Sequence, residues 1–323
     1  MQLRHGNIRP PPTSTRWCKE WHHHSFYELG VEHGLKGGTV PLDAASVLWQ
    51  LAARHARDYI DGNYTPALCE WARWLNIIRS ICQWKLLVIM DGRENVDKAP
   101  EIARRKERVE AAKAKDNLSG QIHNTPKYIT LALNVCKQMS IDVMVAAYEA
   151  DPQVSYESMK RNLVPVTADS DEIAYGISTK VVIVQGFLYQ WYRIIDLEAD
   201  VEEGKYPLFD LYKRHGRIVF QLYAGCSGCD FTEVRSGITG IGIKKFILAA
   251  NNIDGELNAK SLAISLWNND NDIVMNDGFE LVDEVEDYLQ RIVNVYVNAK
   301  VYDKDGNIIN ITTSEVIKNV LCS

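Results

Sequence analysis

Two patterns of apolar and polar positions alternate along the first two thirds of the chain. Short, nearly continuous apolar runs are typical of buried parallel strands, and longer segments with apolar residues every three or four positions are typical of amphipathic helices. The predicted strands are Thr39–Leu42, Lys85–Met90, Ile141–Ala147, Leu163–Val166 and Lys180–Gln185. The predicted helices are Ala44–Tyr59, Ala67–Gln83, Pro100–Lys115, Pro126–Met139 and Pro152–Arg161. This alternation predicts an α/β domain, with a mostly parallel central sheet and helices on both faces.

Helical periodicity dominates from about Tyr206 onward. The predicted helices there are Leu208–Tyr223, Lys244–Ala250, Ala259–Trp267 and Phe279–Ile292. Residues 293–312 predict a hairpin that turns at Asp305-Gly306, because Asp-Gly between alternating apolar residues favours a tight turn. We therefore expect an irregular N-terminal extension (1–36), an α/β core (37–205) and a helical region (206–323).

Composition limits the classes to which the protein can belong. The chain has 323 residues, of which 46% are apolar and 24% charged, and no apolar run approaches the ~20 residues of a membrane span. Its seven scattered cysteines favour free thiols and a reducing compartment. A net charge of −6 is unusual for a protein that binds nucleic acid. That objection weakens if the acids gather at a metal site, because bound cations reverse the local field.

Acidic residues recur where the predicted strands end. Six of them follow four strands and a seventh follows a helix: Asp43, Asp91, Glu149, Asp151, Asp169, Asp171 and Asp230. The carboxyl ends of parallel strands meet at one edge, where ligands of open sheets bind. Carboxylate oxygens suit Mg²⁺ or Mn²⁺, and two such ions could hold both the attacking and the leaving oxygen of a phosphoryl group. Capping of helices and turns is the alternative, and it is the ordinary explanation for Asp43 alone.

Three motifs, in the same order, resemble those of the flap endonuclease and 5′-exonuclease family, the XPG-type structure-specific nucleases. They are YEADPQ at 148–153, TADSDEIAYG at 167–176 and SGCDF…GITGIGIKK at 227–245. The resemblance extends from about Gly37 to Phe246 and leans toward the 5′-exonuclease branch. It implies a PIN-like core in which all seven acids bind two Mg²⁺ or Mn²⁺ ions.

The same resemblance implies an activity and its partners. We expect a metal-dependent 5′ nuclease, an exonuclease or a flap endonuclease, that acts on double-stranded DNA with a 5′ end, flap or gap. It would work as a monomer in DNA replication or repair, in the nucleus or alternatively in mitochondria. No membrane partner is expected, and the chain contains no sliding-clamp motif at its end.

Family positions also assign roles around a helical arch, which would span residues 92–124. Lys98 and Arg105 lie seven and fourteen residues after Asp91, where the family places cations over the scissile phosphate. Arg93 begins the basic stretch of this arch and is expected to contact nucleic acid. Trp49 occupies the position of a ring that stacks on a nucleobase, although a core position is its main alternative.

The segment SGITGIGIKKF resembles the hairpin of a helix–hairpin–helix element. Such a hairpin anchors duplex DNA through its backbone and can hold a monovalent cation. The residues implied are Gly240, Gly242, Lys244 and Lys245. The nearby Cys226-x-x-Cys229 could be a metal or redox motif, but without a second pair in range two ordinary thiols are favoured.

The chain departs from the family pattern in two places. It begins Met-Gln-Leu rather than Met-Gly-Ile, and the stretch after Lys115 is shorter than the family's, which predicts an abbreviated second half of the arch. These departures favour an alternative function, a catalytically silent nuclease-like module that binds nucleic acid or protein. A phosphatase for small substrates is a third hypothesis, against which the basic helix and the hairpin count.

Overall fold

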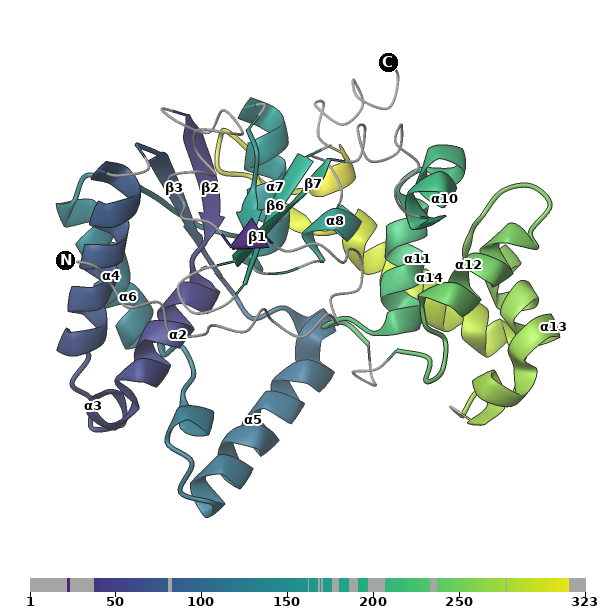
Figure 1. Ribbon diagram of the computed structural model, residues 1–323, viewed down its shortest axis with the longest axis horizontal. Coiled ribbons are helices and arrows are strands. Elements are labelled where there is room, and N and C mark those ends of the chain that lie inside the picture. Colours follow the sequence, from purple (N-terminus) through teal and green to yellow (C-terminus); the bar gives the residue numbers. More distant parts are fainter. Residues whose placement is uncertain are drawn as a thin grey trace.

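The computed structural model describes residues 22–23, 38–80, 83–161, 163–167, 169, 171–175, 180–185, 191–196, 207–232, 237–276 and 278–313. The strands are β1 (His22–His23), β2 (Thr39–Asp43), β3 (Lys85–Met90), β4 (Asp142–Val145), β5 (Val166–Thr167), β6 (Lys180–Gln185), β7 (Trp191–Asp196), β8 (Lys300–Tyr302) and β9 (Ile308–Asn310). The large sheet has the order β1-β7-β6-β5-β2-β3-β4 (Figure 1). Strands β6, β5, β2, β3 and β4 are parallel, whereas β7 and β1 pair antiparallel. The predicted mostly parallel sheet is confirmed.

Helices cover both faces of this sheet, as predicted. Those of the α/β part are α2 (Ala45–Arg54), α3 (Ala56–Ile60), α4 (Thr65–Ser80), α5 (Ala99–Ala114), α6 (Pro126–Gln138), α7 (Ala150–Arg161) and α8 (Glu172–Tyr175). Successive residues of β3 contribute to cores on opposite faces of the sheet, because side chains of a strand point alternately to its two sides. Leu86 and Val88 join a core with α2, α4 and α6, and Leu87 and Ile89 join a core with α7.

The helices that follow residue 206 form the largest cluster of buried apolar residues. This cluster also includes residues of the α/β domain. The helices are α10 (Pro207–His215), α11 (Ile218–Ser227), α12 (Ile243–Asn251), α13 (Ala259–Asn276) and α14 (Val282–Val297). Ile173, Ala174 and Tyr175 of α8 are buried in this cluster. No helix within the described ranges is both long and apolar enough to cross a membrane.

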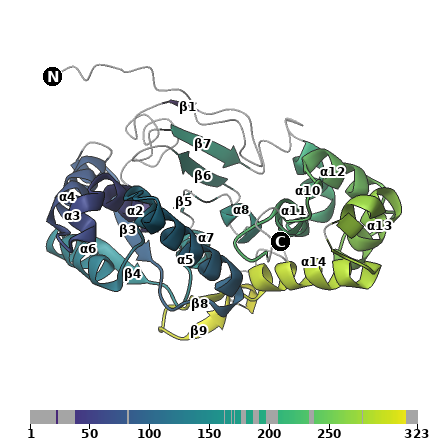
Figure 2. The same ribbon diagram turned by 90° about the horizontal axis from the view of Figure 1, so that it is seen from below.

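The small β8–β9 hairpin returns to the α/β part and packs on α7. Val301 and Ile311 form a buried cluster with Tyr156, and the hairpin can be seen beside α7 in Figure 2. The fully buried side chain of Gln153 donates a hydrogen bond to the Tyr302 carbonyl (3.1 Å) and accepts one from the Tyr302 N–H (2.8 Å). Both polar groups of one amide are thereby satisfied, which fixes the hairpin against the helix.

Several predicted elements differ from the observed ones. The predicted helix Leu208–Tyr223 is interrupted at Gly216, whose φ of +70° is a left-handed conformation that glycine adopts readily. Residues 293–297, predicted as part of the hairpin, extend α14, because Val293 and Tyr296 face the helical core. Strand β7 was not predicted. The expectation of an irregular segment at 1–36 is wrong at His22–His23, and the rest of that segment lies outside the described residues.

Residues 92–124, where the arch was predicted, contain one long helix followed by a short return to α6. The chain leaves β3, forms the short helix η1 (Val96–Lys98) and continues into α5, which projects away from the sheet (Figure 1). Pro100 lies in the first turn, where its missing N–H costs no hydrogen bond. After α5 the chain returns through one short helix, η2 (Ser119–Gln121), to α6. The return is held to α2 and α3, since Asn124 donates to the Ala45 carbonyl (2.8 Å) and Tyr59 donates to the His123 carbonyl (2.7 Å).

A close backbone contact holds the loop that follows α11. Gly237 has a φ of +64°, and a Cβ placed on it would lie 2.2 Å from the backbone nitrogen of Gly228. The neighbouring N–H of Ile238 donates to the Cys226 carbonyl at 2.9 Å. Only glycine fits this approach, which closes the loop that carries Asp230.

We expect Gly237→Ala to destabilise the protein by about 2–3 kcal/mol more than Gly216→Ala, because only the first adds a collision to a left-handed backbone. Gly216 has a similar φ of +70°, and a Cβ there meets no atom within 4 Å. Urea denaturation of both variants measures the difference. Equal losses of unfolding free energy would contradict the close contact at Gly237.

Candidate functional site

The predicted acidic edge forms where the parallel strands end. Asp43 is the last residue of β2, and it pairs in register with Ile89, two positions before Asp91. Glu149 and Asp151 lie at the start of α7, and Asp169 and Asp171 lie between β5 and α8. Sheet register therefore brings acids from four strand ends to one edge.

Backbone N–H groups orient several of these carboxylates. The Ala45 N–H donates to Asp43 Oδ1 (2.9 Å), and the Ala150 N–H donates to Asp91 Oδ1 (2.9 Å). The first contact has the form of a helix cap. Asp43 therefore combines the capping role expected of a single aspartate with a place in the acidic cluster. The second depends on Gly92, where a Cβ would overlap the Ala146 carbonyl oxygen at 1.8 Å.

The carboxylates are close enough to change each other's protonation. Burial, and then the charges of Asp91 and Asp169, raise the pKa of Asp43 to about 7. Burial and the charges of Asp169 and Asp43 raise the pKa of Asp151 well above its ordinary value. Burial likewise raises the pKa of Glu149, although Lys98 opposes the shift. Such shifts are expected where like charges share a poorly solvated site.

An eighth acid, Glu172, lies beside this group and was missed in the sequence. Its side chain is 1% exposed, and burial raises its pKa to about 8. The Ser155 hydroxyl donates to Glu172 Oε1, whereas Glu172 Oε2 has no hydrogen-bond partner among the described residues. Its only signal was its place beside Asp171 in a motif whose other acids had already been assigned.

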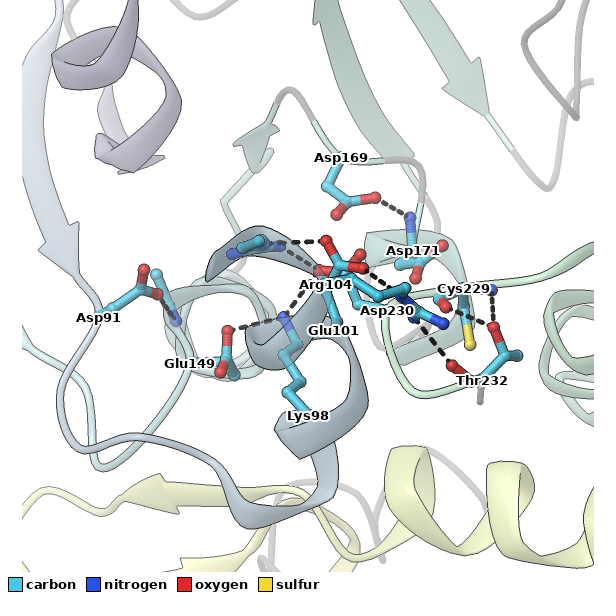
Figure 3. A network of polar contacts seen from close by, with 12 residues as sticks. Asp91, Lys98, Glu101, Arg104, Glu149, Asp169, Asp171, Cys229, Asp230 and Thr232 are labelled. Atoms are coloured by element: carbon cyan, nitrogen blue, oxygen red, sulfur yellow. Dashed lines mark hydrogen bonds and ion pairs between the residues drawn. The ribbon is translucent and has the colours of Figure 1, made fainter. Parts of the chain in front are cut away.

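Two cations from the arch contact the cluster (Figure 3). Lys98, at the end of η1, places its Nζ 2.7 Å from Glu149 Oε2 and 3.2 Å from Asp230 Oδ2. Arg105 places its Nη2 2.9 Å from the same Asp230 oxygen. Burial lowers the pKa of Lys98, but Glu149, Asp230 and Asp151 raise it above its ordinary value, so the ammonium remains charged. The position of Lys98 just before α5 agrees with the prediction.

The acids fit hard divalent cations, although they do not yet surround one. Within the described ranges no three Asp, Glu, His or Cys side chains are arranged as ligands of one ion. Asp151 Oδ1 is buried and has no hydrogen-bond partner in the described part of the chain. A buried, unpaired carboxylate oxygen is costly, and coordination of a cation would satisfy it. The all-oxygen donor set matches Mg²⁺ or Mn²⁺ rather than zinc.

Helix α14 supplies a polar contact that the sequence did not indicate. The buried Tyr296 hydroxyl donates to Asp171 Oδ2 at 3.0 Å. The prediction of a strand at 293–297 had placed Tyr296 in a distant hairpin. The observed contact shows that the helical region positions one of the acids.

The predicted nucleic-acid contacts lie outside the carboxylate cluster. Trp49 on α2 is 44% exposed and donates from Nε1 to the Ile122 carbonyl (3.1 Å), so its alternative as a core residue is wrong. Arg93 is exposed beside β3, and the four hairpin residues lie at or near the start of α12. Gly240, Gly242 and Lys244 are exposed there, whereas Lys245 pairs with Asp270 at 2.6 Å.

The predicted free thiols are confirmed for the described cysteines. Cys226 and Cys229 are buried and form no disulfide with each other; Cys136 is a buried thiol elsewhere in the fold, and Cys69 is an exposed one. Burial raises the pKa of Cys226 to about 12, which keeps it a neutral thiol. The expected ordinary role of the Cys-x-x-Cys segment is therefore supported.

Comparison with solved structures identifies the fold. The catalytic core of Rad2 in complex with DNA substrate superposes with a TM-score of 0.59 at 16% identity, covering 90% of each chain. Flap endonuclease-1 from Methanococcus jannaschii gives 0.50 at 20% identity, covering 86% of this chain and 97% of that one. The chain has the fold of the XPG-type flap endonucleases. The Holliday junction-resolving enzyme GEN1, in complex with product DNA and a Mg²⁺ ion, shares this flap endonuclease fold. It gives a TM-score of 0.55 at 17% identity over 88% of this chain and 63% of that one.

No protein-family model and no curated protein sequence matches the chain. At identities of 20% or less, the structural likeness establishes the flap endonuclease fold. The sequence resemblance predicted this fold from its motifs, and the prediction is confirmed. The activity must be argued from the site.

The raised pKa values of Asp43 and Glu172 predict that, without divalent cations, the protein becomes less stable as pH rises from about 4 to about 8. In this window the folded state retains protons that the unfolded state has already lost, so rising pH favours unfolding. We expect Asp43→Asn to melt several degrees above wild type at the upper end of the window in EDTA, with no such gain at the lower end.

Added Mg²⁺ should raise the melting temperature of wild type more than that of Asp43→Asn, because ligand binding stabilises the folded state. Asp142→Asn, at an exposed aspartate of β4, is the matched control and should follow wild type. Identical pH profiles for wild type and Asp43→Asn would show that Asp43 is not buried among like charges.

Proposed function

We propose that the protein is a divalent-metal-dependent, structure-specific nuclease that hydrolyses phosphodiester bonds in DNA duplexes bearing a 5′ end, flap or gap. One observation carries this proposal. At the carboxyl edge of the sheet, the buried Oδ1 of Asp151 has no hydrogen-bond partner among the described residues, and the neighbouring Glu149 and Asp230 contact two arch cations, Lys98 and Arg105. Structures with the same fold support it, because the Rad2 core and GEN1 were both solved with DNA.

The seven predicted acids, with Glu172 beside them, would hold two Mg²⁺ or Mn²⁺ ions. When bound, such ions lower the pKa of water and stabilise the charge of a leaving oxygen. Glu149 and Asp230 contact Lys98 and Arg105 in this structure. If these two carboxylates held a divalent cation, Lys98 and Arg105 would become available to orient the scissile phosphate and offset its developing negative charge.

The remaining predicted residues would bind duplex away from the reacting phosphate. The half-exposed ring of Trp49 offers a surface on which a base can stack, a contact that contributes about 1–3 kcal/mol. Gly240, Gly242 and Lys244 would contact the backbone, where a monovalent cation could also bind. Lys245 contributes less directly, because its ammonium is paired with Asp270. Arg93, which is exposed, would contact phosphates at the start of the arch.

Space for a substrate adjoins the acids. A cavity of about 640 Å³ lies between the base of the arch, the start of α7 and α14, and Glu149 forms part of its wall. Tyr148, Arg291 and Asn294 also line it. Its volume lies within the range of small-ligand sites, so it can accommodate nucleotides next to the cluster.

The proposal extends to the type of nuclease activity, the cellular process and the compartment. The motifs resemble those of the 5′-exonuclease branch most, and the protein would act as a 5′-3′ exonuclease or a flap endonuclease in DNA replication or repair, as a monomer in the nucleus or alternatively in mitochondria. The alternative is a catalytically silent DNA-binding module, which the present pairing of Glu149 and Asp230 with cations favours. The unpaired oxygen of Asp151 counts against it, because a scaffold gains nothing from such a group.

The purified protein should cleave a 5′-labelled flap duplex with Mg²⁺ or Mn²⁺ and not with EDTA. Asp171→Asn should lose at least about 100-fold in rate while it still binds DNA, because one metal-facing charge is removed. Release of the label as a mononucleotide or as an intact flap separates exonuclease from endonuclease activity. Asp142→Asn, at an exposed acid remote from the cluster, is the control. Salt-sensitive binding without cleavage in either metal would support the silent module.

Lys98→Ala should slow single-turnover cleavage by about 100-fold or more, since the side chain acts on developing charge rather than on overall binding. Affinity for the same duplex, measured by fluorescence anisotropy, should change by less than about threefold, because binding is shared among many phosphate contacts. Lys113→Ala removes an exposed lysine of α5 that pairs only locally with Glu110, and should cleave as wild type does. A large loss of affinity with a normal cleavage rate would assign Lys98 to binding.

A further inference from the structure

Glu101 is a buried acid at the base of the arch that belongs to none of the roles above. It lies in the first turn of α5 and is 5% exposed. Three arginines donate to it: Arg104 through Nε (3.1 Å), Arg105 through Nε (3.0 Å) and Arg108 through Nη2 (2.5 Å). Burial raises the pKa of Glu101, but Arg105 and Arg104 lower it overall, so it remains an anion.

The guanidinium of Arg105 contacts two acids through different nitrogens. Nε donates to Glu101, and Nη2 donates to Asp230, one of the predicted metal ligands. Nζ of Lys98 also contacts the same Asp230 oxygen, at a distance of 3.2 Å. A divalent cation at Asp230 would compete with both side chains for this oxygen. Arg105 would then lose its Nη2 partner and keep its Nε partner.

Glu101 also connects the arch to the loop that carries Asp230. Arg104, which Glu101 holds through Nε, donates from Nη2 to the carbonyl of Thr232 (3.0 Å, Figure 3). Residues three and four positions apart share one helix face, so Arg104 and Arg105 both reach back to Glu101. Exposed pairs of this kind contribute little, but a buried carboxylate requires compensation. The base of α5 is thereby fixed relative to Asp230.

From this geometry we infer that Glu101 is a positioning residue, which holds Arg105 through Nε so that Nη2 can pass from Asp230 to the phosphodiester. This inference rests on the proposed nuclease function. The guanidinium suits the role, because its fixed planar donors allow one edge to be anchored while another is presented. A lysine at 105 would carry all its donors on one nitrogen, so it could not keep one contact fixed while it moved another to the phosphodiester.

A double-mutant cycle tests the inference. Glu101→Ala should slow single-turnover cleavage of a 5′-flap duplex by about 100-fold, the effect of a misplaced catalytic group, while affinity changes by less than about threefold. In an Arg105→Ala background, Glu101→Ala should slow cleavage by less than about twofold further, because both changes remove the same function. Glu101→Gln should recover part of the rate, since its amide oxygen still accepts from Nε.

Glu110→Ala is the matched control, because Glu110 is an exposed acid of the same helix whose ion pair, among the described residues, is with Lys113. It should cleave at the wild-type rate. If Glu101→Ala slows cleavage equally with and without Arg105, Glu101 serves only to anchor α5, and the inference is overturned. The inference is also overturned if, in every variant, the loss of cleavage rate parallels a loss of thermal stability.

A second measurement separates this inference from the proposed function. If wild type cleaves no DNA, the proposed function fails, but the Nε–H signal of Arg105 in ¹⁵N NMR spectra still reports its anchoring. This signal should exchange slowly with water in wild type and Glu110→Ala, and rapidly in Glu101→Ala. Equal exchange in wild type and Glu101→Ala would overturn the positioning role whatever the activity.

Discussion

Repulsion among buried carboxylates is the constraint around which this protein is organised. Sheet register brings Asp43 and Asp151 to one edge, where burial and the charge of Asp169 raise the pKa of both, and the charge of Asp43 further raises that of Asp151. Like charges in a poorly solvated site remain together only when the fold holds them and opposite charge is near. Backbone N–H groups hold Asp43 and Asp91, and the arch supplies the ammonium of Lys98. The same stored repulsion makes the edge receptive to divalent cations.

The arch is therefore part of the acidic site rather than an appendage to it. At its base, Lys98 and Arg105 reach Asp230, and Arg104 reaches the backbone of the same loop. Along its short return, hydrogen bonds from Trp49 and Tyr59 hold it to the α2–α3 side. These contacts at both ends hold the arch against the rest of the protein.

The helical region contributes to the same edge through its core. Helix α8 is buried among the C-terminal helices, and the hydroxyl of Tyr296 on α14 donates to Asp171. The hairpin that follows α14 is fixed to α7 by the amide of Gln153, two residues after Asp151. Loss of packing in the helical region would therefore disturb the acids directly, even though they follow strands of the α/β part.

The sequence by itself determined the parallel strands of the sheet, their acidic edge, the long helix α5 and the position of Lys98 before it, because strand and helix periodicity and the spacing of acids are local properties. It could not place Trp49 inside or outside the core, nor decide between strand and helix at 293–297, where apolar spacing fits both. Only the tertiary structure paired Arg105 with Asp230 and Tyr296 with Asp171, each across 125 positions of sequence. It also buried Glu101, which resembles any solvated helix acid in the sequence. Such pairings depend on which distant elements pack together, and no local pattern records that.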